Sequence, residues 1–123
     1  MGTAEFMFGL EHRTVGSTLF LLLSGELDIW AEEELAPRTL RLIGAIRPEV
    51  VIDLERVTFL DASGVRLLLA IRRCVQQRRG TVHLIRAHGQ PQLVLQLTGL
   101  EHDFDLRAGE PGGPSGQGPA VSA

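Results

Sequence analysis

Apolar residues in this chain occur in short runs separated by glycine, proline and charged residues, a pattern typical of alternating strands and helices. Residues 8–15 mix apolar and polar side chains and predict a short edge strand. Residues 18–23 form a continuous apolar run and predict a buried strand. The sequence Gly-Glu-Leu-Asp at residues 25–28 is expected to break that strand and lead into a helix.

The first predicted helix follows Asp28, whose side chain is suited to cap its N-terminus. Glu32, Glu33 and Glu34 fall in its first turns, where the helix dipole favours negative charge. Pro37 interrupts the pattern, because an internal proline removes a backbone hydrogen bond. Either the helix is kinked at Pro37 or its regular part begins there. The apolar face consists of Leu35, Leu42, Ile43 and Ile46.

A β-branched stretch at residues 50–54 predicts a strand of central-sheet character, and residues 57–60 continue from it to Asp61. The second helix is predicted over residues 65–79, and Gly80 is expected to end it in the usual C-terminal position. Its buried side is formed by Val65, Leu68, Leu69, Ile71 and Val75. Its opposite side is formed by Arg66, Arg73 and Gln77.

The last part of the chain continues the alternation. Residues 81–85 predict a strand, and residues 90–97 predict a short helix with Pro91 in its first turn. Gly99 is expected to close this helix, and residues 104–106 to add a final strand. The side chains expected to face inward are those of Leu93, Val94 and Leu97.

Strands that alternate with helices indicate an α/β fold with a mixed, largely parallel sheet. We expect about five strands and three to four helices in one domain over residues 7–108. Residues 109–123 are too rich in glycine and proline to bury apolar surface, and we expect a disordered tail. Residues 1–6 are expected to be vector-derived or disordered.

The amino-acid composition argues against several kinds of binding and catalytic site. A net charge of −3 argues against nucleic-acid binding, which needs a dense basic face. All 12 cationic residues are arginines, so a Schiff-base lysine and a P-loop lysine are excluded. Cys74 is the only cysteine, and the four histidines lack the spacing of a helical metal site. No metal or cofactor is expected.

Membrane contact is not expected either. The longest apolar run, residues 18–23, is far shorter than the roughly 20 residues that a spanning helix requires. No basic segment followed by an apolar one marks a signal peptide. We therefore expect a cytoplasmic protein that is a monomer or a weak dimer.

Three motifs fall at junctions between predicted elements: Gly25-Glu26-Leu27-Asp28, Asp61-Ala62-Ser63-Gly64 and Leu97-Thr98-Gly99-Leu100. With the order of elements, they make residues 8–106 resemble the STAS family, whose best-known members are bacterial anti-sigma-factor antagonists. The resemblance implies a non-enzymatic protein that binds an anti-sigma factor with serine kinase activity and so regulates transcription indirectly. Phosphorylation by that kinase would switch binding off, and a PP2C-type phosphatase would reverse it.

Ser63 matches the phosphoacceptor of these antagonists. Ala62 stands where the family often has a second serine, which leaves Ser63 as the only hydroxyl of the motif. Position alone predicts that Ser63 is a helix N-cap, a role that Asp61 could fill equally well. A hydroxyl at a helix start is expected to be exposed, and free backbone N–H groups there tolerate a phosphate.

The predicted partner-binding residues around Ser63 are Asp28, Asp61, Ala62, Gly64 and Arg66. Both aspartates are expected at the same end of the sheet, as helix caps or as partner contacts. Gly64 is interpreted as required for close backbone packing rather than merely tolerated. Arg66 is expected either to be solvated or to meet an acidic patch on the partner.

Two other functions fit the sequence less well. A phosphorylation-independent STAS module could sense a ligand or act as a scaffold in another signalling complex. A serine hydrolase would need the nucleophile elbow Gly-x-Ser-x-Gly, but Asp61 stands two residues before Ser63.

Overall fold

The computed structural model describes residues 7–104 as four strands and four helices around one core. The elements are, in chain order, β1 (Phe8–Val15), β2 (Thr18–Leu27), α1 (Ile29–Leu42), β3 (Glu49–Leu60), α2 (Ala62–Gln77), β4 (Thr81–Ile85), α3 (Gly89–Thr98) and α4 (Leu100–Asp103).

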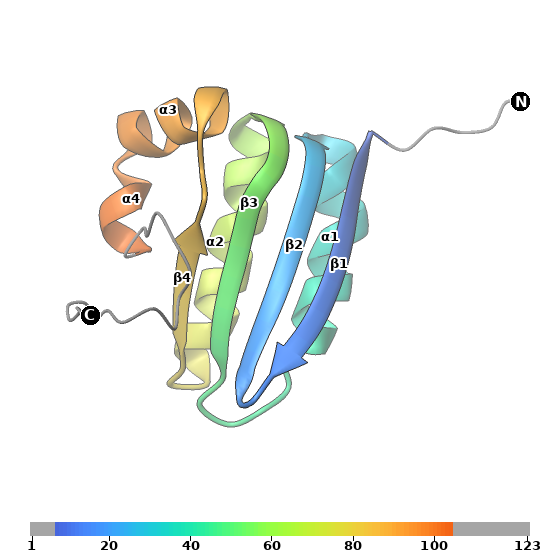
Figure 1. Cartoon of the computed structure of the whole chain (residues 1–123), viewed down its shortest axis with the longest axis vertical. Coiled ribbons are helices and arrows are strands. Elements are labelled where there is room, and N and C mark those ends of the chain that lie inside the picture. The colour runs from blue at the N-terminus through green and yellow to red at the C-terminus, as the bar shows by residue number, and fades with distance from the viewer. Residues whose placement is uncertain (1–6, 105–123) are drawn as a thin grey trace, which may run out of the picture.

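The sheet has the strand order β1-β2-β3-β4. Strands β1 and β2 form an antiparallel hairpin, whereas β2 pairs with β3 and β3 with β4 in parallel. Each parallel pair is joined by a helix, α1 or α2, and Figure 1 shows both helices on the same face of the sheet. Helices α3 and α4 lie beside β4 (Figure 1). The predicted α/β class with a mixed, largely parallel sheet is confirmed.

The core lies between the sheet and helices α1 and α2. Strands β2 and β3 direct alternate side chains toward the helices, as the two-residue period of a strand requires. Phe104, which follows α4, is also fully buried in this core. The fully buried side chains of the central strands and of α2 include Leu21, Leu23, Leu27, Val50, Ile52, Leu54, Leu67, Leu68, Ile71 and Val75.

Strand β3 is one continuous strand in which two β-bulges occur. Its pairing with β2 shifts between Leu22 and Ser24 and again between Gly25 and Glu26. At the first bulge, Asp53 Oδ1 accepts a hydrogen bond of 2.9 Å from the backbone N–H of Glu55. Since a bulge places an extra residue in one strand, β3 uses more residues than β2 to reach the same end of the sheet.

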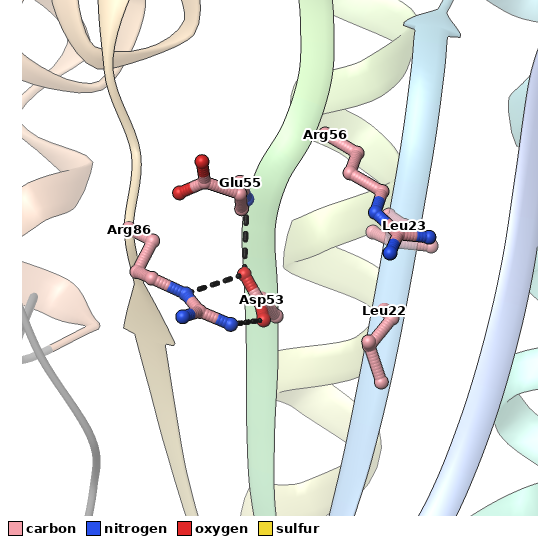
Figure 2. A pocket seen from close by; sticks show the side chains of 6 residues that line it. All are labelled: Leu22, Leu23, Asp53, Glu55, Arg56 and Arg86. Atoms are coloured by element: carbon pink, nitrogen blue, oxygen red, sulfur yellow. Dashed lines mark hydrogen bonds and ion pairs between the residues drawn. The ribbon is translucent and has the colours of Figure 1, made fainter.

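The negative charge of Asp53 is balanced by an arginine that follows the neighbouring strand. Its side chain is buried, and Arg86, just after β4, forms an ion pair with both of its carboxylate oxygens (Figure 2). These two residues line a small hollow together with Leu22, Leu23, Glu55 and Arg56. Because a buried carboxylate needs a partner, Arg86 makes the polar position inside β3 tolerable.

Several boundaries differ from the sequence-based predictions. Strand β2 does not end at Gly25 but continues to Leu27, and the backbone N–H of Glu26 donates to the carbonyl of Met7 at 2.7 Å. Helix α1 runs through Pro37, so it does not begin there. Helix α2 begins at Ala62 rather than at residue 65.

Three predicted inward-facing side chains are exposed. Ile46 lies beyond the end of α1 and is 86% exposed, and Leu93 and Leu97 of α3 are exposed as well. Helix α3 instead buries Pro91 and Leu95, which are four residues apart and therefore share one face.

The end of α2 also differs in detail. Arg79, not Gly80, adopts the left-handed backbone conformation, with a φ of 61°. A Cβ on Gly80 would lie 2.0 Å from the carbonyl oxygen of Pro48, so the glycine permits a close approach between two loops. Gly99 closes α3 in the left-handed conformation, as predicted.

Some predictions cannot be compared with the structure. Those for residues 1–6, for the tail 109–123, for the domain boundary at residue 108 and for strand residues 105 and 106 lie outside the described residues. Phe104, the first residue of that predicted strand, instead follows α4 as its C-cap.

Candidate functional site around Ser63

Helices α1 and α2 begin side by side because β2 and β3 are parallel neighbours. Leu27 and Leu60, the last residues of these strands, are paired in the sheet. The aspartate after each of them caps the following helix, so both N-termini lie at one end of the sheet (Figure 1). The expectation that Asp28 and Asp61 share one end of the sheet is confirmed.

The two caps have the same geometry. Asp28 Oδ1 accepts hydrogen bonds of 3.1 Å from the backbone N–H groups of Trp30 and Ala31. Asp61 Oδ1 accepts from the backbone N–H groups of Ser63 and Gly64, at 2.8 and 3.1 Å. These bonds satisfy amides that have no partner inside the helix.

Asp61, and not Ser63, is therefore the N-cap of α2. Ser63 lies in the first turn of the helix, and its backbone N–H is already bound by Asp61. The residue is also only 8% exposed, whereas an exposed hydroxyl was expected. Since capping is done by Asp61, the serine hydroxyl has no role in starting the helix.

Gly64 permits α2 to pack directly against the end of β2. A Cβ at this position would lie 2.5 Å from the carbonyl oxygen of Leu27 and 2.5 Å from a methyl carbon of Leu60. The leucine methyl could turn aside but the backbone carbonyl could not, so the glycine is required for close packing. Ala62, the other small residue of the motif, is exposed.

Arg66 contacts the Ser63 hydroxyl. Its Nη2 donates a hydrogen bond of 2.9 Å to Ser63 Oγ, one turn earlier in the same helix. The guanidinium also binds Glu32 of α1, with Nε donating to Oε2 at 3.1 Å and Nη2 donating to Oε1 at 3.0 Å. Arg66 therefore joins Ser63 to the neighbouring helix.

The electrostatics of this cluster favour a fixed positive charge. The hydrogen bond and the charge of Glu32 raise the pKa of Arg66 above its usual value, and the charge of Asp61 contributes in the same direction. The side chain of Arg66 is 54% exposed and that of Glu32 only 23%. Arg66 thus presents its charge to solvent while remaining oriented by Glu32.

Sequence reasoning placed Arg66 on the exposed face but did not link it to Glu32. These residues are 34 positions apart and on different helices, so no local spacing relates them. Glu32 was interpreted only as a favourable charge near a helix N-terminus. The contact depends on the side-by-side start of α1 and α2, which is a property of the folded sheet.

Large apolar side chains are exposed beside these caps. Ile29 and Trp30 directly follow Asp28, and Trp30 is 68% exposed. Phe59, two residues before Asp61, is 40% exposed. Because an exposed tryptophan next to a polar cluster is a common feature of binding surfaces, this end of the sheet is the best candidate for a partner interface.

Other kinds of site receive no support from residues 7–104. Within that range no three His, Cys, Asp or Glu side chains are grouped so that they could hold a metal ion. No described helix is long and apolar enough to cross a membrane.

The sequence matches the STAS domain over residues 10–111. The chain belongs to the STAS family. Among curated proteins, the sequence comparison finds no match.

Solved structures agree with this assignment. The anti-sigma factor antagonist SpoIIAA in its unphosphorylated form is 26% identical, with a TM-score of 0.72, and the match covers 84% of this chain and 90% of that one. The phosphorylated form of SpoIIAA from Bacillus gives 26% identity and a TM-score of 0.66, with coverage of 84% and 93%.

An anti-sigma factor antagonist from Mycobacterium paratuberculosis is also 26% identical, with a TM-score of 0.70 and coverage of 80% and 84%. The fold alone is shared with the murine anion transporter Slc26a9. That chain is 15% identical with a TM-score of 0.63, and the match covers 75% of this chain and 15% of the transporter.

Proposed function

We propose that this STAS protein is an anti-sigma-factor antagonist that binds an anti-sigma factor with serine kinase activity and is switched off by phosphorylation of Ser63. The observation that carries the proposal is the position of Ser63 Oγ. It lies at the start of α2, in the cluster that Arg66 and Glu32 join to the first turn of α1, where Trp30 is exposed. A modification at this atom therefore changes the charge of a candidate interface. The likeness to SpoIIAA, which is known in unphosphorylated and phosphorylated forms, supports the same assignment.

The surroundings of Ser63 favour a phosphoacceptor over a hydrolytic nucleophile. A catalytic serine needs a base that accepts its proton. Among the described residues, the side chain bonded to Ser63 Oγ is the guanidinium of Arg66, which can only donate. The base must then come from another protein, as it does when a kinase modifies a serine.

The proposed modification is a phosphoryl transfer from ATP bound to the kinase. A bond forms between Ser63 Oγ and the γ-phosphorus, and the bond from that phosphorus to the bridging oxygen of ADP breaks. The hydroxyl proton passes to a base of the kinase, and ADP leaves. A PP2C-type phosphatase would reverse the step by hydrolysis, releasing inorganic phosphate.

Charge alone is sufficient to switch such an interface off. Phosphorylation adds about −1.5 to −2 charges beside Glu32 and Asp61. For an acidic partner group about 6 Å away at an effective dielectric constant near 20, each added charge costs about 3 kcal/mol, or roughly a hundredfold in affinity. We infer that this protein acts in the cytoplasm and affects transcription only through its partner.

Incubation with the cognate kinase and ATP, followed by mass-spectrometric mapping, tests the site. We expect one phosphate on Ser63 and none on Ser63→Ala. In calorimetric binding assays, Ser63→Ala should bind the unmodified partner as the wild type does, and Ser63→Glu should bind far more weakly. Equal binding by both variants would contradict the switch and favour a phosphorylation-independent STAS scaffold.

A further inference from the structure

The Glu32–Arg66–Ser63 cluster links two helices through a single guanidinium. Glu32 lies in the first turn of α1 and Ser63 in the first turn of α2. One Arg66 nitrogen, Nη2, donates to both, at 3.0 Å to Glu32 Oε1 and 2.9 Å to Ser63 Oγ. A change at Ser63 therefore acts on the atom that holds Glu32.

We propose that Arg66 is a switchable tie, which joins α1 to α2 through Glu32 while Ser63 is unmodified and moves to the phosphoryl group when Ser63 is phosphorylated. The inference rests on the proposed function in one respect only, the modification of Ser63. It adds the residue that senses the phosphate and the element to which the change is transmitted.

Arg66 is already in place to bind a phosphate. The phosphorus would be bonded to the oxygen that Nη2 contacts at 2.9 Å, so its terminal oxygens fall within reach of the guanidinium without movement of α2. A phosphoserine carries about −1.5 to −2 charges, whereas Glu32 carries one. Arginine can also donate two parallel hydrogen bonds to a phosphate. Such charge-assisted hydrogen bonds are stronger than those between neutral groups.

Glu32 loses its partner in this exchange. The fork of Nε and Nη2 that now holds its carboxylate cannot hold a phosphate in the same geometry at the same time. The carboxylate would then face a phosphate, with the charge of Asp61 close enough to affect Arg66 as well. Repulsion should loosen the first turn of α1, which carries the exposed Ile29 and Trp30.

The test uses the full chain with phosphoserine inserted at position 63 during translation, so that no kinase is needed. The pH midpoint of the phosphoserine ³¹P signal reports the charge beside it. We expect a midpoint that is roughly half to one pH unit higher in Arg66→Gln than in the wild type, because an adjacent cation stabilises the dianion. In Glu32→Gln the midpoint should be lower than in the wild type, since Arg66 no longer has a competing carboxylate.

Arg73→Gln is the matched control, because Arg73 is an exposed arginine on the same helix, about three turns after Ser63. Its midpoint should equal that of the wild type. Arg66→Lys keeps the charge without the fork and should fall between the wild type and Arg66→Gln. Equal midpoints in Arg66→Gln and Arg73→Gln would overturn the proposal.

Amide hydrogen exchange tests whether phosphorylation loosens the first turn of α1. The backbone N–H of Glu32 donates to the carbonyl of Asp28 at 2.9 Å in the first turn of α1. Phosphorylation should speed its exchange to the rate found in unmodified Arg66→Gln, and should have no further effect in Glu32→Gln. An unchanged exchange rate of the Glu32 amide in the phosphorylated wild type would contradict the proposed effect on α1.

The two proposals can fail separately. If no kinase modifies Ser63 but the inserted phosphate is bound by Arg66, the tie stands and the proposed function fails. If phosphorylation abolishes partner binding while the ³¹P midpoint does not depend on Arg66, the function stands and the tie fails.

Discussion

Gly64 lies so close to Leu27 that a single added carbon on the glycine would come within 2.5 Å of the leucine carbonyl oxygen. This contact brings the start of α2 against the end of β2. The position of Ser63 beside α1 therefore depends on the absence of a side chain at the next residue. The interpretation of Gly64 as a residue required for close backbone packing is confirmed by this distance.

We expect Gly64→Ala to destabilise the fold by about 1–3 kcal/mol, because overpacking against backbone cannot be relieved by a rotamer change. Urea denaturation followed by circular dichroism measures the effect. Gly44→Ala is the control, since a Cβ there meets no atom within 4 Å. A Gly64→Ala variant as stable as Gly44→Ala would contradict the required close packing.

The capping role of Asp61 predicts a loss of about 1 kcal/mol in Asp61→Ala, with most of the stability retained in Asp61→Asn. Both Asp61 bonds end on one oxygen, and an asparagine side chain offers the same acceptor. Asp28→Ala should cost a similar amount, because its cap has the same geometry. Thermal unfolding of the three variants provides the comparison, and an Asp61→Asn as unstable as Asp61→Ala would argue against capping.

Trp30 should contribute to partner affinity and little to stability. Its side chain is 68% exposed, so Trp30→Ala should leave the unfolding temperature nearly unchanged. Binding to the proposed anti-sigma factor partner should weaken by about 2 kcal/mol or more, roughly thirtyfold, if Trp30 is an interface residue of the usual kind. Ile46→Ala is the control, because Ile46 is also exposed and lies in the loop between α1 and β3, at the other end of the sheet (Figure 1). Equal affinities in the two variants would place the interface elsewhere.

Substitution of Asp53 should lower the stability of the fold without changing partner affinity. Asp53→Ala should leave Arg86 without its carboxylate and Glu55 without its acceptor, at a cost of about 2–4 kcal/mol. Chemical denaturation measures this loss. Partner affinity at a temperature where the variant remains folded should match that of the wild type, because Asp53 lies in β3 and Arg86 just after β4 rather than beside Ser63. A selective loss of affinity would instead indicate that this charged hollow takes part in binding.

Local signals accounted for much of the fold. Asp28 was recognisable as a cap because capping involves only the next three residues, and β4 was predicted with the bounds it has. Whether Ser63 or Asp61 caps α2 could not be decided, since both residue types serve and the choice depends on where the helix begins. The exposure of Leu93 and Leu97 was missed because three apolar positions in a short helix do not fix which face is inward.

Long-range contacts were beyond sequence reasoning. The extension of β2 through Gly25, which has a φ of 81°, depends on a backbone bond to Met7 across the hairpin. The ion pairs of Glu32 with Arg66 and of Asp53 with Arg86 join residues more than 30 positions apart. Each pair forms only when neighbouring strands or helices have been aligned.

The two bulges of β3 determine that alignment. Paired residues of β2 and β3 are 31 positions apart at Leu22 and Asp53, and 33 apart at Leu27 and Leu60. The two additional residues place Asp61 level with Asp28, and thus Arg66 level with Glu32. Removing both would leave β3 about 6.6 Å too short at this edge, given a rise of about 3.3 Å per residue. The position of the proposed switch is thus set inside the sheet, and an insertion or deletion in β3 would shift Ser63 relative to Glu32 without changing any residue of the proposed partner surface.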